Sequence, residues 1–134
     1  MKHALWLPVI LWLSPCAPAH AAVLDILADG SGPYADLEQA LGTAQSGDTL
    51  RLGDGIYTGP GNRNLILGGA RLTILSASGE PGDCVLDLES QGRAFLIYST
   101  PATLLRIEGI TLRAGDPRQL PENQLRGYGG GLAI

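Results

Sequence analysis

The sequence predicts an all-β protein whose short strands wind into a solenoid, with one short α-helix near its N-terminal end. Three observations predict this fold. Apolar runs of three to five residues alternate with segments rich in glycine and other turn-forming residues. From residue 72 onward, the strand centres fall near 74, 86, 96 and 106, at intervals of ten to twelve residues. One segment, residues 36–44, has the periodicity of a helix instead.

The composition is that of a globular protein. The 134 residues are enough for one domain, and 45% of them are hydrophobic and 16% charged. Nine basic and thirteen acidic residues give a net charge of −4. Because a nucleic-acid partner usually requires a basic face, we expect no nucleic-acid partner.

The first 21 residues have the pattern of a secretory signal peptide. A basic start at Lys2 and His3 precedes an apolar run over residues 4–13. Residues 19–21 (AHA) then form a small-x-small cleavage site, so the mature chain is predicted to begin at Ala22. The sequence therefore predicts export and a secreted, extracellular or cell-surface location.

Two other interpretations fit this N-terminal segment less well. A membrane anchor needs about 20 apolar residues to span a bilayer, and the apolar run is much shorter. A lipoprotein signal would place the lipid on Cys16, but Pro15 directly before the cysteine disfavours it. After signal cleavage we expect no membrane span.

The mature chain, residues 22–134, lacks several residue types that carry chemistry. Removing residues 1–21 takes away the only lysine and both histidines, and leaves eight arginines against thirteen acidic residues. Without histidine, neither a Ser-His-Asp triad nor a Cys-His pair can form, and a zinc site lacks its usual ligands. Without lysine, no Schiff base can form. We therefore predict no catalytic, cofactor-binding or metal-binding residues and no cofactor for this chain.

Eight short segments are predicted as strands. Several alternate apolar and polar residues at a period of two, as residues 50–52 (LRL) do, which indicates a strand with one buried face. Glycine, aspartate, asparagine, proline and serine fill the gaps between them, as turns require. The predicted strands are residues 23–27, 49–52, 65–67, 72–75, 85–88, 95–98, 104–107 and 110–113.

A single cysteine, Cys84, is left in the mature chain after signal cleavage. It has no intrachain partner, so a disulfide within one chain is excluded. Because it stands between Asp83 and Val85 at the start of a predicted strand, we expect it to be a small buried apolar side chain.

A short helix is predicted over residues 37–45. Asp36 and Gln39 are spaced as a capping box, in which the two side chains satisfy free backbone N–H groups at the helix start. Gly42 lowers the helix propensity by about 1 kcal/mol relative to alanine, and residues 46–48 (SGD) end the helix. The apolar positions follow the spacing i, i+3, i+4 and i+7 of one helix face: Leu37, Ala40, Leu41 and Ala44.

The strand spacing alone fits either an antiparallel meander or a solenoid. Few connections contain tight hairpin signals such as Asn-Gly, which favours a solenoid of three strands per turn of about 30 residues. At Gly109 the apolar positions run 105, 107 and then 110, 112, so one residue is inserted. We interpret this insertion as a sharp bend between two strands, the alternative being a β-bulge within one strand.

Several segments together resemble a known family. Residues 29–34 (DGSGPY), the predicted helix, residues 47–52 (GDTLRL) and residues 55–57 (GIY) are similar to the N-terminus of right-handed parallel β-helix proteins of the pectin-lyase-like type. Residues 107–112 (IEGITL) resemble the rungs of these proteins. The resemblance covers nearly all of residues 23–134 and implies a right-handed parallel β-helix whose open N-terminal end is capped by the helix. It does not imply an activity.

The two ends of this predicted β-helix differ. The helix would cover free backbone groups and apolar side chains at the first coil. Residues 127–134 (GYGGGLAI) show no comparable cap, and about three coils are near the lower limit for a stable repeat array. We therefore expect residues 22–134 to be the N-terminal part of a longer β-helix domain or a truncated gene product. The uncapped last rung near residues 132–134 is expected to promote self-association.

Asp83, Asp87 and Glu89 form the first group of candidate site residues. Asp87 and Glu89 share the parity of one strand, and paired carboxylates can hydrolyse glycosides or bind calcium. The simpler interpretation, which we favour, is a solvated outer face.

A second group consists of Arg106, Glu108, Arg113 and Asp116. The polysaccharide lyases that share the resembled fold use a calcium ion held by aspartate and a basic residue that removes a proton, and here only arginine is available. No lyase motif maps onto these four positions. We therefore expect exposed arginines paired with nearby acids.

Two functions remain open. We expect a non-catalytic, secreted or cell-surface β-helix module of the passenger or adhesin type, because no catalytic constellation accompanies the fold. The alternative is the N-terminal part of a polysaccharide lyase or glycoside hydrolase with its active site beyond residue 134, and it rests on the fold resemblance alone. A polysaccharide or another cell-surface ligand is the expected partner.

Overall fold

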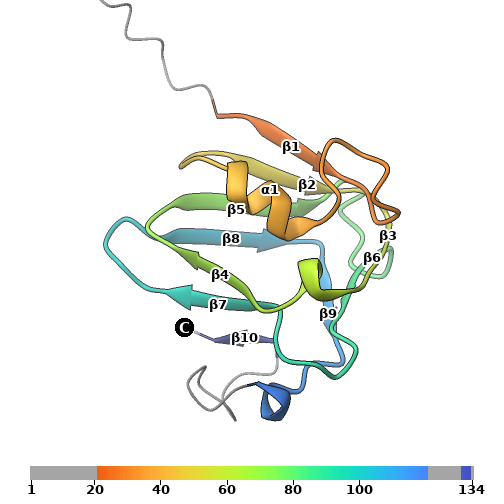
Figure 1. Cartoon of the computed structure of the whole chain (residues 1–134). Coiled ribbons are helices and arrows are strands. Elements are labelled where there is room, and N and C mark those ends of the chain that lie inside the picture. Colours follow the sequence, from red (N-terminus) through yellow and green to blue (C-terminus); the bar gives the residue numbers. More distant parts are fainter. Residues whose placement is uncertain (1–20, 121–130, 134) are drawn as a thin grey trace, which may run out of the picture.

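The computed structural model describes residues 21–120 and 131–133 (Figure 1). Within them lie ten strands, one α-helix and two short 3-10 helices. The predicted signal peptide up to His20, most of the C-terminal segment 127–134 and the residues before it from 121 lie outside the described residues. No helix in the described part of the chain is both long and apolar enough to cross a membrane.

The strands form three parallel sheets. Sheet A contains β1 (Val23–Ile26), β2 (Thr49–Leu52), β5 (Arg71–Ser76) and β8 (Leu104–Glu108). Sheet B contains β3 (Gly55–Tyr57), β6 (Cys84–Asp87) and β9 (Thr111–Arg113). Sheet C contains β4 (Leu65–Gly68), β7 (Phe95–Tyr98) and β10 (Leu132–Ala133).

The chain runs through sheets A, B and C in that order three times, from β2 to β4, from β5 to β7 and from β8 to β10. We call each of these a pass. Each strand pairs in parallel with the strand one pass later, so Leu50 lies beside Ile74 and Ile74 beside Ile107. β1 comes before the first pass and pairs with β2. Because all the described ladders are parallel, the antiparallel meander is excluded as an explanation of the strand spacing.

The eight predicted strands are confirmed, each with bounds within one residue of the prediction. The bend at Gly109 is confirmed as well, because β8 ends just before it in sheet A and β9 begins just after it in sheet B. Gly109 has φ +65°, the left-handed conformation that glycine adopts at little cost. The β-bulge interpretation is therefore wrong. β3 was not among the predicted strands.

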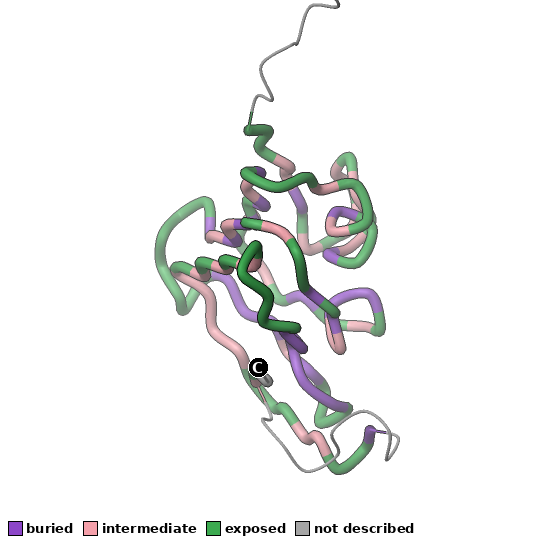
Figure 2. Tube along the Cα trace, turned by 90° about the vertical axis from the view of Figure 1, so that its left-hand side faces the viewer, coloured by how far each residue is buried: buried purple, intermediate pink, exposed green. Residues whose placement is uncertain are grey.

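The inward-facing side chains of the three sheets share one core. Leu50 and Ile74 of sheet A, Leu86 of sheet B and Phe95 of sheet C are all fully buried and belong to one cluster. Figure 2 shows buried segments alternating with exposed turns. The longest buried segment of the described residues is 92–97, which includes most of β7, and exposed residues 89–91 separate it from β6. β6 and β7, the middle strands of sheets B and C, are each buried at most of their positions.

The predicted helix is present as α1 (Leu37–Thr43), two residues shorter than expected at its C-terminal end. One half of the capping box is confirmed, because the Gln39 N–H donates to Asp36 Oδ1 at 2.9 Å. In the other half, Gln39 Oε1 accepts from the N–H of Ala35, one residue before the N-cap, at 2.6 Å. Leu37 and Ala40 are fully buried, while Leu41 and Ala44 are half-buried against the core. The predicted apolar face of the helix therefore packs inward, more deeply at its start than at its end.

Residues 61–64 (GNRN) attach α1 to the first pass. Asn62 is buried; its Oδ1 accepts from the Leu37 N–H at 3.0 Å, and its Nδ2 donates to the Thr58 carbonyl at 2.8 Å. The first free N–H of the helix is thus satisfied by a side chain 25 residues away. Gly61 leaves room for the capping residue, because a Cβ added there would collide with the Asp36 carboxylate.

Two residues of the segments that resemble β-helix proteins hold the first strands together. The Tyr57 hydroxyl is buried within 2.9 Å of the Ile26 carbonyl and 2.8 Å of the Gly53 carbonyl, so β3 is tied to the end of β1. Asp48 accepts from the Ala22 N–H and from the Gln45 N–H, each at 2.8 Å, and so joins β1 and the end of the helix loop to β2.

These two N–H donors, Gln45 first and Ala22 second, hold the pKa of Asp48 below its usual range. A carboxylate with a lowered pKa stabilises the fold above its unfolded pKa, near 3.9, and this contribution is lost as the pH falls through the folded pKa. We therefore expect the free energy of unfolding to fall as the pH drops below about 4. In Asp48→Asn the slope of this loss should be shallower, as measured by urea titrations between pH 2.5 and 7.

Asp48→Asn should also be less stable than the wild type at pH 7, because its amide oxygen can accept only in place of one carboxylate oxygen and its amide nitrogen cannot accept the other N–H group. The exposed Asp54 offers a matched control, and Asp54→Asn should leave the stability at pH 7 unchanged. Parallel pH profiles for wild type and Asp48→Asn would contradict the role given to Asp48.

Candidate functional site

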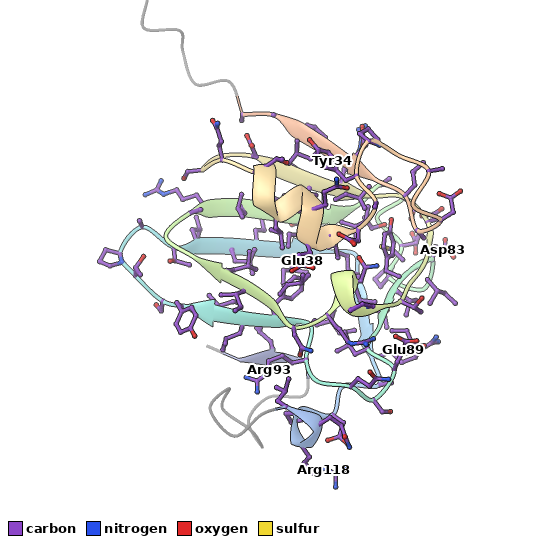
Figure 3. All side chains as sticks on the ribbon, viewed as in Figure 1. Tyr34, Glu38, Asp83, Glu89, Arg93 and Arg118 are labelled. Carbon is purple, nitrogen blue, oxygen red and sulfur yellow. The ribbon has the colours of Figure 1, made fainter. Side chains whose placement is uncertain are left out.

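The carboxylates predicted as the first candidate site do not form a pair. Asp87 accepts from Arg113 Nη2 at 2.7 Å on the outer face of sheet B, and this contact above all lowers the pKa of Asp87. Glu89 lies two residues past β6 with φ +54°, and its side chain turns instead to Arg63. Asp83 lies at the opposite end of β6, and Figure 3 shows it well separated from Glu89. A shared strand parity therefore did not bring these groups together.

The second predicted group is also divided. Arg106 and Glu108 are neighbours on the outer face of β8 in sheet A, with Arg106 Nε donating to Glu108 Oε1 at 2.7 Å. Arg113 belongs to sheet B and pairs with Asp87. Asp116 pairs with Arg118, whose hydrogen bonds lower the pKa of Asp116. The prediction of exposed arginines paired with nearby acids is confirmed for these residues.

Cys84 is fully buried, as predicted. Burial, with a smaller effect of the nearby Asp54 charge, raises the pKa of the Cys84 thiol to about 11. The thiol is therefore neutral at pH 7 and is a weak nucleophile. Burial likewise raises the pKa of Tyr57 above its ordinary value.

A groove lies between α1 and β4, the first strand of sheet C along the chain. Three adjoining hollows form it: the outer two have volumes of about 550 and 160 Å³, and the middle one shares lining residues with both. Glu38 and Asn64 belong to the middle hollow and the polar one, and Leu41 and Ile66 to the middle hollow and the apolar one. We call this surface the helix–sheet groove. It runs along β4 for the whole length of the strand.

The two ends of the helix–sheet groove differ in chemistry. At the start of β4 it is lined by polar side chains, including Arg63, Gln91 and Gln119. The side chain of Arg63 is only 13% exposed and is fixed by Glu89 and by Gln91, whose Oε1 accepts from Nη2 at 2.9 Å. A guanidinium held in this way presents a rigid planar edge to the groove.

The other end of the groove is apolar and opens onto the outer face of sheet C. Ile66 and Leu104 are more than 60% exposed at its rim. Tyr98 is 56% exposed and lies directly over Gly68, where a Cβ would come within 3.2 Å of the Tyr98 Cβ. Gly68 lines the apolar hollow, so Tyr98 is the strand neighbour of a residue of the groove.

Neither a metal-binding cluster among the described residues nor a similarity to known proteins identifies a ligand. Within residues 21–120 and 131–133, no group of three or more histidine, cysteine, aspartate or glutamate side chains is placed to hold a metal ion. Comparisons of the chain with protein families, with curated proteins and with solved structures found no match. The shape and chemistry of the helix–sheet groove are therefore the observations that bear on function.

The periodicity of the sequence could not have revealed this groove. Gly68 and Tyr98 lie 30 positions apart and become neighbours only through the register of β4 with β7. Arg63 and Gln91 lie in turns, which carry no periodic signal. The only local sign was Gly68-Gly69 directly after an apolar run, which marks a turn rather than a ligand.

Proposed function

We propose that this chain is an exported, right-handed parallel β-helix module of the pectin-lyase-like type, which binds a glycan in the helix–sheet groove and is not a catalyst. Three parallel sheets visited in turn and a helix attached before the first pass support the β-helix. The pattern of residues 1–21 supports export. A passenger or adhesin of the cell surface is the class of protein that this combination fits.

The observation that supports this ligand is a groove whose polar end holds fixed planar groups and whose apolar end includes Gly68, the strand neighbour of the exposed Tyr98. A sugar ring has an apolar C–H face that packs on an aromatic ring, and hydroxyl groups that amides and guanidinium groups can bind in pairs. An elongated groove fits several linked sugars better than one compact molecule. Because the mature chain carries eight basic and thirteen acidic residues, a neutral glycan is favoured over a polyanion.

Calorimetric titration of the exported protein with xylohexaose, cellohexaose and hexagalacturonate tests this function. We expect at least one of the two neutral hexasaccharides to bind more tightly than the uronate. Tyr98→Ala should weaken that binding by at least about tenfold, because the stacking platform is lost. The matched control is Ile56→Ala: Ile56 is 52% exposed on the outer face of sheet B and lines none of the three hollows, so its loss should not change the affinity.

Three results would overturn the proposed function. If none of the three hexasaccharides bound, a glycan would be wrong as the ligand. If wild type and Tyr98→Ala bound equally tightly, the helix–sheet groove would be wrong as the binding site. Cleavage of a uronate polymer by the pure chain, abolished in Asp87→Asn or Arg106→Gln, would replace the binding module with a polysaccharide lyase.

N-terminal sequencing of the exported sample should start at Ala22, and a retained Met1 would contradict export by signal cleavage.

A further inference from the structure

The free edge of β4 forms one wall of the helix–sheet groove. No described strand pairs with this edge, and the other edge of β4 pairs with β7. The Leu65 N–H donates to the carbonyl of Ala94, directly before β7, at 2.9 Å. Because alternate residues of a parallel strand bond to the same neighbour, the N–H and C=O groups of Ile66 and Gly68 point away from β7. Both residues line the groove, so their backbone groups are available to a ligand.

The last turn of α1 forms the opposite wall. Leu41 lines both the middle and the apolar hollow, and Gly42 lines the middle one. The Ala44 N–H donates to the Ala40 carbonyl at 3.0 Å and so closes the helix. The carbonyl groups of residues 41–43 come later in the chain and have no partner within the helix. A ligand between the two walls thus meets backbone donors and acceptors on β4 and backbone acceptors on α1.

The apolar hollow between these walls reaches down to the core. Leu72, which lines it, is a buried member of the core cluster, and Leu105 packs against that cluster. Among the described residues, its only polar side chain is Thr103, whose hydroxyl already donates to the Tyr98 carbonyl at 3.0 Å and accepts from the Gly69 N–H at 2.8 Å. A sugar hydroxyl at this depth would lose its hydrogen bonds to water, whereas a methyl group would gain free energy on burial. The hollow therefore suits an apolar group that projects from a polar chain.

We infer, on the basis of the proposed function, that the glycan of the helix–sheet groove carries acetamido groups, one of which places its methyl group in the apolar hollow and bonds through its amide to the two walls. A trans amide directs its C=O and its N–H to opposite sides. The C=O can accept from the N–H of Ile66 or Gly68, and the N–H can donate to a carbonyl of the last turn of α1. A hydroxyl group lacks the methyl, and an O-acetyl ester lacks the donor.

Charge favours the acetamido group over a free amine or a carboxylate. No charged side chain among the described residues lines the apolar hollow, and in the middle hollow the described part of the chain contributes one charge, that of Glu38. An amine in its ammonium form would be drawn to Glu38 but would lose its hydration in the apolar hollow, and a carboxylate would also be repelled by Glu38. A neutral acetamido group meets neither cost.

A peptide strand is the other ligand that pairs with an open sheet edge. Such a strand would present its own outer N–H and C=O groups to α1, whose last turn offers only carbonyls. The carbonyl groups of the peptide would therefore stay unbonded beside the Leu41 side chain. A glycan turns only its acetamido groups to the walls and keeps its other groups in water, which favours the glycan.

Calorimetric titration of the exported protein with cellohexaose, hexa-N-acetylchitohexaose and the hexamer of glucosamine tests this inference. The three share one β-1,4-linked backbone and differ at carbon 2, which carries a hydroxyl, an acetamido or an amino group. We expect the acetamido hexamer to bind more tightly than the other two by at least about tenfold, since the hollow selects its methyl group and the walls select its amide. Cellohexaose should still bind, through the polar end of the groove.

Two variants fill the apolar hollow. Ala44 and Ala70 both line it, and Ala44→Leu and Ala70→Leu each place a larger side chain there. Each should weaken binding of the acetamido hexamer by at least about tenfold and leave the affinity for cellohexaose unchanged, because only the methyl group is displaced. Ala77→Leu is the matched control, since Ala77 is exposed and lines none of the three hollows. Thermal melts and retained binding of cellohexaose should show that each variant is folded.

Equal affinities of the wild type for cellohexaose and the acetamido hexamer would overturn the acetamido group and leave a glycan in the groove intact. Equal losses for both hexasaccharides in folded Ala44→Leu and Ala70→Leu would overturn the apolar hollow as the acetamido site. Tighter binding of the glucosamine hexamer would overturn the selection of a neutral group. Tighter binding of the blocked peptide acetyl-Ala-Thr-Ala-Thr-Ala-Thr-amide would replace the glycan by strand addition to β4. Failure of every hexasaccharide to bind would instead refute the proposed function itself.

Discussion

Leu37→Asp is expected to leave the protein largely unfolded at 25 °C. Leu37 is fully buried at the start of α1, within the core that the helix shares with the sheets. Loss of leucine packing at such a site costs about 2–5 kcal/mol. A buried carboxylate without a cation adds a further penalty. Because domains of this size are stable by only about 5–15 kcal/mol, far-ultraviolet circular dichroism should show loss of most of the β signal.

Leu41→Asp is the matched comparison on the same helix. Leu41 is half-buried and lines the helix–sheet groove, so a carboxylate there keeps contact with water. We expect this variant to fold, with a urea midpoint between those of the wild type and of Leu37→Asp. If the two variants melted alike, or if Leu37→Asp melted like the wild type, α1 would not be the cover of the core that its burial indicates.

Gly55→Ala is expected to lower the free energy of unfolding by about 2–6 kcal/mol, the second large effect. Gly55 has φ +141°, a conformation that costs other residues about 1–3 kcal/mol. An added Cβ would also lie only 2.6 Å from the Ala28 Cβ, so either β3 or the loop after β1 must shift, at a further cost of about 1–3 kcal/mol. Urea unfolding followed by circular dichroism measures the loss.

Gly42→Ala is the control for removal of a glycine as such. Gly42 lies within α1, has no atom within 4 Å of an added Cβ, and carries no positive φ. We expect this variant to be more stable than the wild type, by up to about 1 kcal/mol, because alanine has the higher helix propensity. Equal stability losses in both variants would mean that the geometry at Gly55 is not the cause.

The strands and the helix could be predicted because each depends on a local pattern. Apolar residues two apart define strands such as β2, and the spacing of Asp36 and Gln39 defines the start of α1. β3 was missed as a strand because it begins with glycine and its two apolar side chains are adjacent, Ile56 exposed and Tyr57 buried, so apolar and polar residues do not alternate. This short strand is held in place by Tyr57, whose hydroxyl donates to the Ile26 carbonyl of β1. Because the two residues lie 31 positions apart, this contact leaves no periodic pattern in the sequence.

The candidate sites were harder to predict because side-chain partners depend on register and on turn conformation. Asp87 and Glu89 were expected on one face, but Glu89 adopts a left-handed conformation and its carboxylate turns to Arg63, 26 residues earlier. Asn62 gave no sign of its role, since its partner Leu37 is known only once the helix is placed. The alternation of side chains predicts which residues of one strand share a face. It does not predict contacts such as these, which join residues far apart in the sequence.

The parallel ladders also determine how the chain can fold. Paired residues lie between 24 positions apart, for Leu50 with Ile74, and 37 apart, for Phe95 with Leu132. Loop-closure entropy grows only slowly with length, so the loops closed by these pairings cost nearly the same. No strand has to wait for a partner from the far end of the sequence, and α1 gains its Asn62 bond as soon as residue 62 is available. A chain that crosses a membrane N-terminus first can therefore fold as it emerges, each pass forming the template for the next.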